Sequence, residues 1–309
     1  RIARAYSNKD NVAICGYHGW HDWYLAANLN NSKTSNLNTH LIKGLDVSGV
    51  PKKLRKTTFT FEYGNFKNFD YLINNKDIGI VKMEVCRNTL PNQKFLRHVR
   101  RKTKEMGIIL IFDECTTGFR QTLGGVHKLT NIKPDMLILG KALGNGYPIT
   151  AVLGMRDVMM YANKSFISST FWTDRIGYAA AIKTIEIMKK TKSWDLITKI
   201  GTKVQKNWKK IFNDNKIKFK VNGLPALSNF TFENNNLEYR TLITQEMLKS
   251  NILASSNIYV SVCHTERILN KYFDCLNDVA NIISKCENGS DIKKFLKTEV
   301  ARKDFQRLN

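Results

Sequence analysis

The chain has 309 residues, 42% of them hydrophobic, and its 49 Lys and Arg against 26 Asp and Glu give a formal net charge of +23. No apolar run reaches the roughly 20 residues of a membrane helix, so we expect no membrane partner. A net charge this positive suggests nucleic acid as a partner. However, the lysines between Lys183 and Lys220 are scattered along helix-like segments, and the sequence has no zinc-finger, RNP or KH signature. We therefore expect no specific nucleic-acid binding.

The first residues predict the end of a helix followed by a strand. "RIARAY" (1–6) lacks an initial Met and is typical of the last turns of a helix, "SNKD" forms a turn, and "NVAICG" (11–16) is a strand. We therefore expect a fragment that begins within a helix.

The middle of the chain alternates between strands and helices. "DIGIVKMEV" (77–85) predicts a strand, residues 92–107 an amphipathic helix ended by Gly107, and "IILIF" (108–112) a buried strand. Such a strand–helix–strand unit indicates an α/β fold with a mostly parallel sheet. Further strands are expected at 135–140 and 149–154, and a long helix at 174–190.

The pattern changes near residue 195. An amphipathic helix at 194–212 is followed by two alternating segments, 216–223 and 226–233, which are typical of antiparallel strands, and then by another helix at 237–251. We expect residues 1–194 to form a large α/β domain and residues 195–309 a smaller C-terminal α+β domain.

Cysteine and histidine spacing argues against disulfides and metals. The six cysteines include no C-x-x-C pair, and a chain of this length needs no disulfide staples, so free thiols in the cytoplasm are expected. His18 and His21 are three residues apart, but no further ligand cluster follows them, and no metal site is expected.

Polar side chains follow three of the predicted strands. Tyr17 and His18 come after "NVAIC", Asp113 directly follows "IILIF", and Lys141 follows "DMLILG". Ligands of open parallel sheets bind at the carboxyl ends of the strands, so we expect these residues to meet there.

Lys141 lies in the apolar, glycine-rich stretch "LILGKALGNGYPITAV" (137–152), which predicts a buried lysine. Pyridoxal phosphate suits such a lysine, since its aldehyde forms an imine with the amine, a carboxylate holds the proton on its ring nitrogen, and an aromatic side chain stacks on the ring. Taken singly, Asp113 could cap a turn, Lys141 could extend from a loop into water, and the aromatic residues could fill a core. Together they favour the cofactor.

Two longer segments carry a family resemblance. "LIFDECTTGFR" (110–120) and "KPDMLILGKALGNGYPITAVLG" (133–154) resemble the signature of class III aminotransferases, which are fold type I pyridoxal phosphate enzymes, and the 28 residues from Asp113 to Lys141 match the family spacing. "CGYHGWHDWYLA" (15–26) and "SSTFWTDRIGYAAAIKTIE" (168–186) are similar to the branch around glutamate-1-semialdehyde 2,1-aminomutase.

The resemblance implies roles for individual residues. Lys141 would form the internal aldimine and shuttle the proton, and Asp113 would bind the pyridinium nitrogen. Tyr17 would cover the ring with His18 beside it, and Cys115 would lie under the other ring face.

The resemblance also implies an assembly. Thr170 matches the position that reaches the phosphate of the neighbouring subunit's cofactor, so a homodimer with shared active sites is expected, and Glu84 matches a glutamate near the cofactor's phenolic side. Members of the family carry a Gly-Ser/Thr phosphate-binding turn in their N-terminal segment, and the resemblance implies that this turn would precede the position of Arg1. Roughly the first quarter of a family member is therefore expected to be missing, and the fragment could be inactive alone.

Three functions stay open at this point. The first is an aminotransferase that moves an amino group between an amino donor and a carbonyl acceptor, which the variants "RNTLP" (87–91) and "STFWTDR" (169–175) favour. The second is the aminomutase that makes 5-aminolevulinate, which residues 64–77 would help to decide. The third is an inactive, truncated member that only dimerises or binds polyanions.

Overall fold

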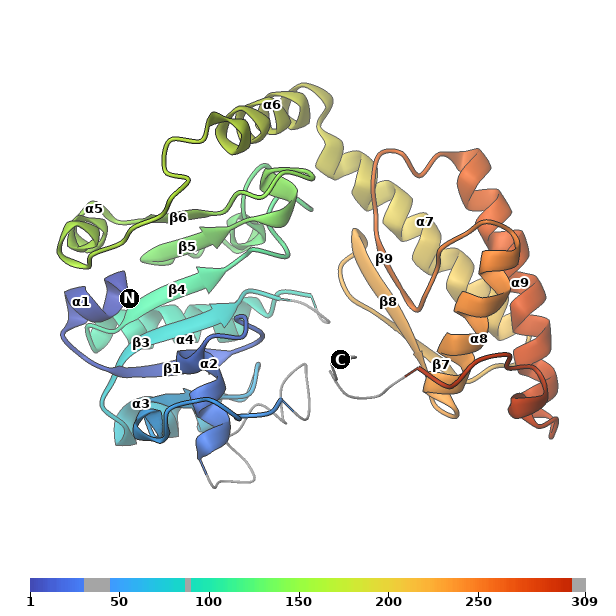
Figure 1. The fold of residues 1–309 in the computed structure, drawn as a ribbon, viewed down its shortest axis with the longest axis horizontal. Helices are drawn as coiled ribbons and strands as arrows, with labels where there is room; N and C mark the ends of the chain where they lie inside the picture. The colour runs from blue at the N-terminus through green and yellow to red at the C-terminus, as the bar shows by residue number, and fades with distance from the viewer. Residues whose placement is uncertain (31–44, 87–89, 302–309) are drawn as a thin grey trace. The chain divides into compact units, whose positions relative to one another are not determined.

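The computed structural model describes residues 1–30, 45–86 and 90–301 (Figure 1). The chain divides into two compact units. The first comprises the described residues of Arg1–Cys86 and Pro91–Ile187, and the second comprises Leu90 and the described residues from Met188 onward. The division falls within helix α6 (Arg175–Thr191), a little before the boundary expected at residue 194.

The first unit is built on a six-stranded sheet, which is parallel except at one edge (Figure 1). Five neighbouring strands run parallel, and β6 pairs antiparallel with β5. The mostly parallel α/β architecture expected from the sequence is confirmed. The strand order is β2 (Thr58–Thr60), β1 (Asn11–Cys15), β3 (Ile78–Glu84), β4 (Ile109–Asp113), β5 (Met136–Leu139) and β6 (Ala151–Gly154).

One face of this sheet packs against three short helices, α1 (Ile2–Ser7), α2 (Asp22–Leu25) and α5 (Arg156–Met159). Alternate side chains of a strand point to opposite faces, and Ile14, Ile80 and Ile111 share this one. They form a core with residues of these three helices. Because Ile80 and Ile111 lie on this face, Lys82, Glu84 and Asp113, two or four residues further along the same strands, lie on it too.

Helices α3 (Phe66–Asn75) and α4 (Gln93–Glu105) pack together and bury an aromatic cluster with Phe61. The α4 helix begins where the Asn92 side chain accepts a hydrogen bond from the Phe95 amide at 3.1 Å. Its buried residues recur at helical spacing, which is why the sequence predicted it at 92–107.

The long helix α6 is unusual in that Ala181 is its one buried residue among those described. Large apolar side chains stay exposed along it and along the segment before it. They are Val152, Leu153, Met155, Met160, Phe166, Ile167, Phe171, Trp172, Ile176, Tyr178, Ile182 and Ile187. An apolar surface of this extent is typical of an interface rather than of a free surface.

The second unit combines an antiparallel three-stranded sheet with three helices (Figure 1). Its core contains a hydrogen bond from Trp208 Nε1 to the Tyr272 hydroxyl at 2.8 Å. The strands are β7 (Phe219–Asn222), β8 (Leu227–Phe232) and β9 (Asn257–Tyr259), and the helices are α7 (Ser193–Asp214), α8 (Asn236–Lys249) and α9 (Glu266–Glu287).

Short 3₁₀ helices complete the two units. They are η1 (Ala26–Leu29), η3 (Lys52–Leu54), η4 (Val126–Thr130), η5 (Lys141–Leu143), η6 (Met160–Lys164) and η7 (Ile292–Lys294). In the described part of the chain, no helix has both the length and the apolar character that crossing a bilayer requires.

Candidate active site

The carboxyl ends of four parallel strands bring the predicted residues to one edge of the sheet. Tyr17 and His18 follow β1, Glu84 ends β3, Asp113 ends β4, and Lys141 follows β5. The parallel pairing of neighbouring strands explains how residues so distant in sequence reach the same edge.

Asp113 lies at the centre of this group and has three hydrogen-bond donors. Its Oδ2 is 2.9 Å from His18 Nδ1 and 3.1 Å from Lys82 Nζ, and its Oδ1 accepts from the Cys115 amide at 3.2 Å. Burial by itself would raise the pKa of the Asp113 carboxyl. The hydrogen bond from His18 and the positive charge of Lys82 outweigh burial and hold that pKa well below its usual range, so the side chain is a carboxylate.

Lys82 was not predicted as a site residue. It lies in β3 opposite Ile111 of β4, and its ammonium group is 5.3 Å from the centroid of the Trp23 ring. The signal in the sequence was a lone lysine inside the apolar strand segment "IGIVKME". Strand periodicity does not reveal a partner, so its pairing with Asp113 needed the sheet register.

Lys141 differs from its expected environment because it is exposed. The apolar stretch does bury Leu143, but Lys141 adopts a left-handed backbone conformation with φ of 46°, and its side chain turns toward the loop after β4. Its Nζ donates to Thr116 Oγ1 at 3.1 Å and to Cys115 Sγ at 3.5 Å. The amine thus reaches the loop that Asp113 begins, without the burial that the sequence predicted.

Gly140 lets the Lys141 segment approach the Cys115 loop. A Cβ on Gly140 would lie 2.8 Å from Cys115 Sγ, so a larger residue would push the two segments apart. Cys115 itself is half-buried, beside the Lys141 amine.

Glu84 fixes the turn that carries Tyr17. The buried Glu84 Oε2 accepts from the Tyr17 amide at 3.1 Å. Gly16 has φ of 109°, and a Cβ there would lie 2.5 Å from the same Glu84 oxygen. The Tyr24 hydroxyl donates to the Gly16 carbonyl at 3.1 Å, and the Tyr17 and Tyr24 rings meet edge to face at 5.9 Å. The half-buried Tyr17 ring is therefore held on a braced turn.

Glu114, also missed by the sequence reasoning, anchors the loop between β4 and η4. Its fully buried carboxylate accepts from the His127 amide at 2.9 Å, from His127 Nδ1 at 2.6 Å and from Thr117 Oγ1 at 3.0 Å. Cys115 and Thr116, which contact Lys141, lie within this anchored loop. Glu114 shapes the site rather than contacting a ligand.

Other predicted positions lie apart from this group. Thr170 is exposed in the turn before α6. Much of the segment 64–77 is helix α3, on the first unit, and Arg87–Thr89 of the "RNTLP" motif lie outside the described residues.

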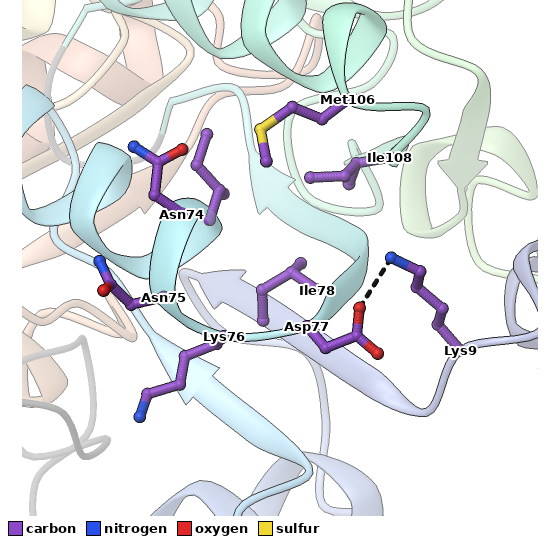
Figure 2. A pocket seen from close by; sticks show the side chains of 9 residues that line it. Lys9, Asn74, Asn75, Lys76, Asp77, Ile78, Met106 and Ile108 are labelled. Carbon is purple, nitrogen blue, oxygen red and sulfur yellow. Dashed lines mark ion pairs between the residues drawn. The ribbon is translucent and has the colours of Figure 1, made fainter.

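The pocket drawn in Figure 2 lies at the opposite edge of the sheet. It has a volume of about 300 Å³ and is lined by Lys9, which precedes β1, by Ile78 at the start of β3, and by Ile108 before β4. Two of its charged groups are paired with each other, since Lys9 Nζ is 2.8 Å from Asp77 Oδ1, and the third is Lys76 (Figure 2). The exposed Lys9–Asp77 pair adds about 0–1 kcal/mol.

The residues at the carboxyl edge fit pyridoxal phosphate. A carboxylate offers about four lone-pair positions, and the three donors to Asp113 leave one on Oδ1 for a pyridinium N–H. The exposed Lys141 amine is available to an aldehyde, and Tyr17 follows β1, which β3 separates from β4 in the sheet. When bound, the cofactor supplies an electron sink that stabilises negative charge on the substrate carbon.

Comparisons with known proteins identify relatives of this chain. The class-III aminotransferase family model matches residues 88–265. The chain is 31% identical to the 3-aminobutyryl-CoA aminotransferase of Cloacimonas acidaminovorans, over 96% of this chain and 68% of the relative. It is 28% identical to a glutamate-1-semialdehyde 2,1-aminomutase of Saccharolobus islandicus, over 92% of this chain and 70% of the relative.

Solved structures share the fold. The internal aldimine form of the FumI protein of Sphingopyxis sp. MTA144 superposes with a TM-score of 0.79 at 20% identity, over 94% of this chain and 69% of that one. An omega-transaminase from Sphaerobacter thermophilus gives a TM-score of 0.78 at 17% identity, over 92% and 70%. The chain therefore belongs to the class-III aminotransferase family, with the type I fold of pyridoxal-phosphate-dependent transferases and pyridoxal 5′-phosphate as its cofactor.

Proposed function

We propose that this chain transfers an amino group from an amino donor to a carbonyl acceptor through a site made by Lys141 and Asp113. The observation that carries the proposal is their link through one loop. Asp113 Oδ1 accepts from the Cys115 amide, and Lys141 Nζ donates to Thr116 Oγ1 of the same loop. A carboxylate for the ring nitrogen and an amine for the aldehyde therefore stand on adjoining segments.

Each residue has a role in this proposal. Lys141 Nζ would hold the cofactor aldehyde, and its amine would move the proton at the substrate carbon. Asp113 keeps a proton on the ring nitrogen by a charge-assisted hydrogen bond. Tyr17 would cover one ring face, with His18 beside it, and Cys115 would contact the other. Glu84, which accepts from the Tyr17 amide, would hold this turn near the phenolic side.

A visible absorption titration of the cofactor-free protein with pyridoxal phosphate, followed by borohydride reduction, tests the role of Lys141. The wild type should give a yellow band, and mass spectrometry should place the reduced adduct on Lys141. The Lys141→Ala variant should lose both. Lys128→Ala is the matched control, since Lys128 donates only to the Leu123 carbonyl, at 2.9 Å, in the nearby loop. An adduct retained in Lys141→Ala would refute the assignment.

The aminomutase is the second candidate, since a named relative has that activity. An aminotransferase passes nitrogen to a separate acceptor, whereas an aminomutase returns it to the same carbon skeleton. A donor labelled with nitrogen-15 should therefore deliver its label to an added keto acid. Isomerisation of glutamate-1-semialdehyde without any acceptor would favour the aminomutase instead.

We also propose a homodimer in which Thr170 reaches the phosphate of the partner's cofactor. The exposed apolar side chains of α6 and of the segment before it support this, because a second copy would cover them. Mixed dimers of Lys141→Ala and Thr170→Ala subunits contain one site with both residues intact. Refolding the two variants together should restore part of the lost activity, whereas each alone should stay weak. No recovery on mixing would contradict the shared site.

The cytoplasm is the proposed location, since unpaired thiols such as the six found here are typical of that compartment. The remaining candidate is a folded but inactive member that binds polyanions through its net charge of +23. Absence of the yellow band, together with retention on heparin that salt abolishes, would favour that reading.

A further inference from the structure

We propose that Lys82 is a positioning residue that holds Asp113 Oδ2 as a permanent counter-ion and thereby lowers the pKa of the cofactor's ring nitrogen. The inference rests on the proposed role of Asp113 as the partner of that nitrogen. It concerns a residue of the central strand β3, whose side chain contacts the carboxylate rather than the cofactor.

The geometry holds the Lys82 ammonium group in one place. The distance from its Nζ to Asp113 Oδ2 is 3.1 Å, and on its other side the Trp23 ring centroid lies 5.3 Å away. The Lys82 side chain is 17% exposed and that of Asp113 10% exposed. The pairing of β3 with β4, in which Glu84 lies opposite Asp113, places the Lys82 backbone two residues before that pair and within reach of the carboxylate.

His18 supplies a hydrogen bond to the same oxygen. Its Nδ1 is 2.9 Å from Asp113 Oδ2, while its Nε2 is buried and has no hydrogen-bond partner among the described residues. The Lys82 ammonium group, 3.1 Å from the same oxygen, adds a full positive charge beside this hydrogen bond.

The other titratable groups around Asp113 come from every neighbouring strand end. Glu84 ends β3 and accepts from the Tyr17 amide, Glu114 accepts from His127 and Thr117, and Lys141 contacts Thr116. Those contacts engage each of these groups away from Asp113 Oδ2. Replacing Lys82 by an uncharged residue therefore removes the positive charge in direct contact with Asp113 Oδ2.

With the cofactor bound, the Lys82 ammonium group and the protonated ring nitrogen would share the Asp113 carboxylate. A lone Asp113 carboxylate would stabilise the pyridinium by a full negative charge, but Lys82 already neutralises much of it. A nearby charge shifts a pKa by about 1–3 units, and Lys82 would act at the lower end because it contacts Oδ2, whereas the remaining lone pair on Oδ1 would accept from the ring nitrogen. With Lys82 in place, that nitrogen would give up its proton more readily.

The test is a pH titration of bound pyridoxal phosphate labelled with nitrogen-15 in its ring, followed by NMR. The Lys82→Met variant keeps the length and apolar stem of the side chain and removes the charge. It should raise the ring-nitrogen pKa by about 1 unit. Lys82→Arg should restore the wild-type value. The matched control is Lys9→Met, which removes the exposed ion pair with Asp77 near the other end of β3 and should leave the pKa unchanged.

The outcomes separate this inference from the proposed function. An unchanged ring-nitrogen pKa in Lys82→Met, with the Lys141-dependent yellow band intact, would overturn the role of Lys82 alone. A purely structural Lys82 would lower the melting temperature of the cofactor-free variant without moving that pKa, and this too would overturn it. Absence of the band from the wild type would overturn the proposed function and, with it, the inference.

Discussion

The backbone amide of Tyr17 donates to Glu84 Oε2 at 3.1 Å, which ties the turn after β1 to the end of β3. We predict that Glu84→Ala lowers the affinity for pyridoxal phosphate about tenfold, because losing a hydrogen bond to a charged acceptor releases the turn that carries the Tyr17 ring. Absorption titration measures the dissociation constant. Glu84→Gln keeps an acceptor oxygen and should recover most of the affinity, and equal affinities for wild type and Glu84→Ala would contradict the bracing role.

The depressed pKa of Asp113 predicts a pH-dependent contribution to stability. A carboxyl group whose folded-state pKa lies below its unfolded value stabilises the fold above the unfolded pKa, near 4, and loses that contribution as the pH falls toward the folded pKa. Asp113→Asn should therefore cost about 3 kcal/mol at neutral pH, because Lys82 is left without its partner.

This difference should shrink below about pH 4, because the Asp113 carboxyl of the unfolded wild type takes up a proton there while the folded carboxylate does not. Urea unfolding of both cofactor-free proteins between about pH 2 and 7 measures it. A difference that stays constant over the range would show that ionisation of Asp113 does not contribute. Asp77→Asn is the control, since the Asp77 side chain is largely exposed in its pair with Lys9.

The sequence predicted the strands and helices that bury continuous apolar patterns. β3 and β4 were foreseen because their segments are almost wholly apolar, and α4 because its buried residues recur at helical spacing. The three-residue strands β2 and β9 were not foreseen, since three residues are too few to show a period of two. Their pairing depends on neighbours distant in sequence.

Some residues of the candidate site could be predicted from the sequence, and others could not. Asp113 and Lys141 were identified because they follow apolar strands, and parallel pairing brings such positions together. Lys82 and Glu114 were missed because their partners come from sheet register and loop closure. The burial predicted for Lys141 was wrong because side-chain direction there follows from the left-handed backbone, which composition does not reveal.

Glu114 should be essential for the shape of the loop that contacts Lys141. Glu114→Gln replaces one acceptor oxygen with an NH₂ group that would face the amide and ring nitrogens of His127. We expect a loss of about 3 kcal/mol in unfolding free energy and weaker cofactor binding, because a buried acceptor is removed from several donors at once. Urea denaturation and the absorption titration measure the two effects. Thr117→Ala removes a single donor to Glu114 and should cost less, so the reverse order would contradict the anchoring role.

The cysteines should differ in reactivity toward iodoacetamide in a predictable order. Cys263 is exposed and should react first, whereas burial raises the pKa of the Cys15 and Cys86 thiols and should keep them unreactive until the protein unfolds. Half-buried Cys115 should react at an intermediate rate, and bound pyridoxal phosphate should protect it. Peptide mass spectrometry gives each rate. Equal labelling of Cys115 with and without cofactor would place it away from the ring.

The stability of the second unit should depend on the hydrogen bond from Trp208 Nε1 to the Tyr272 hydroxyl, which is 2.8 Å long and lies deep in the core. Tyr272→Phe keeps the ring but leaves the buried indole N–H without an acceptor, which should cost about 1–3 kcal/mol in unfolding free energy. Tryptophan fluorescence during urea unfolding reports the change. Tyr71→Phe alters an exposed tyrosine of α3 and should change stability little. Because the proposed catalytic residues all belong to the first unit, the yellow band of Tyr272→Phe should stay at wild-type strength below its unfolding transition.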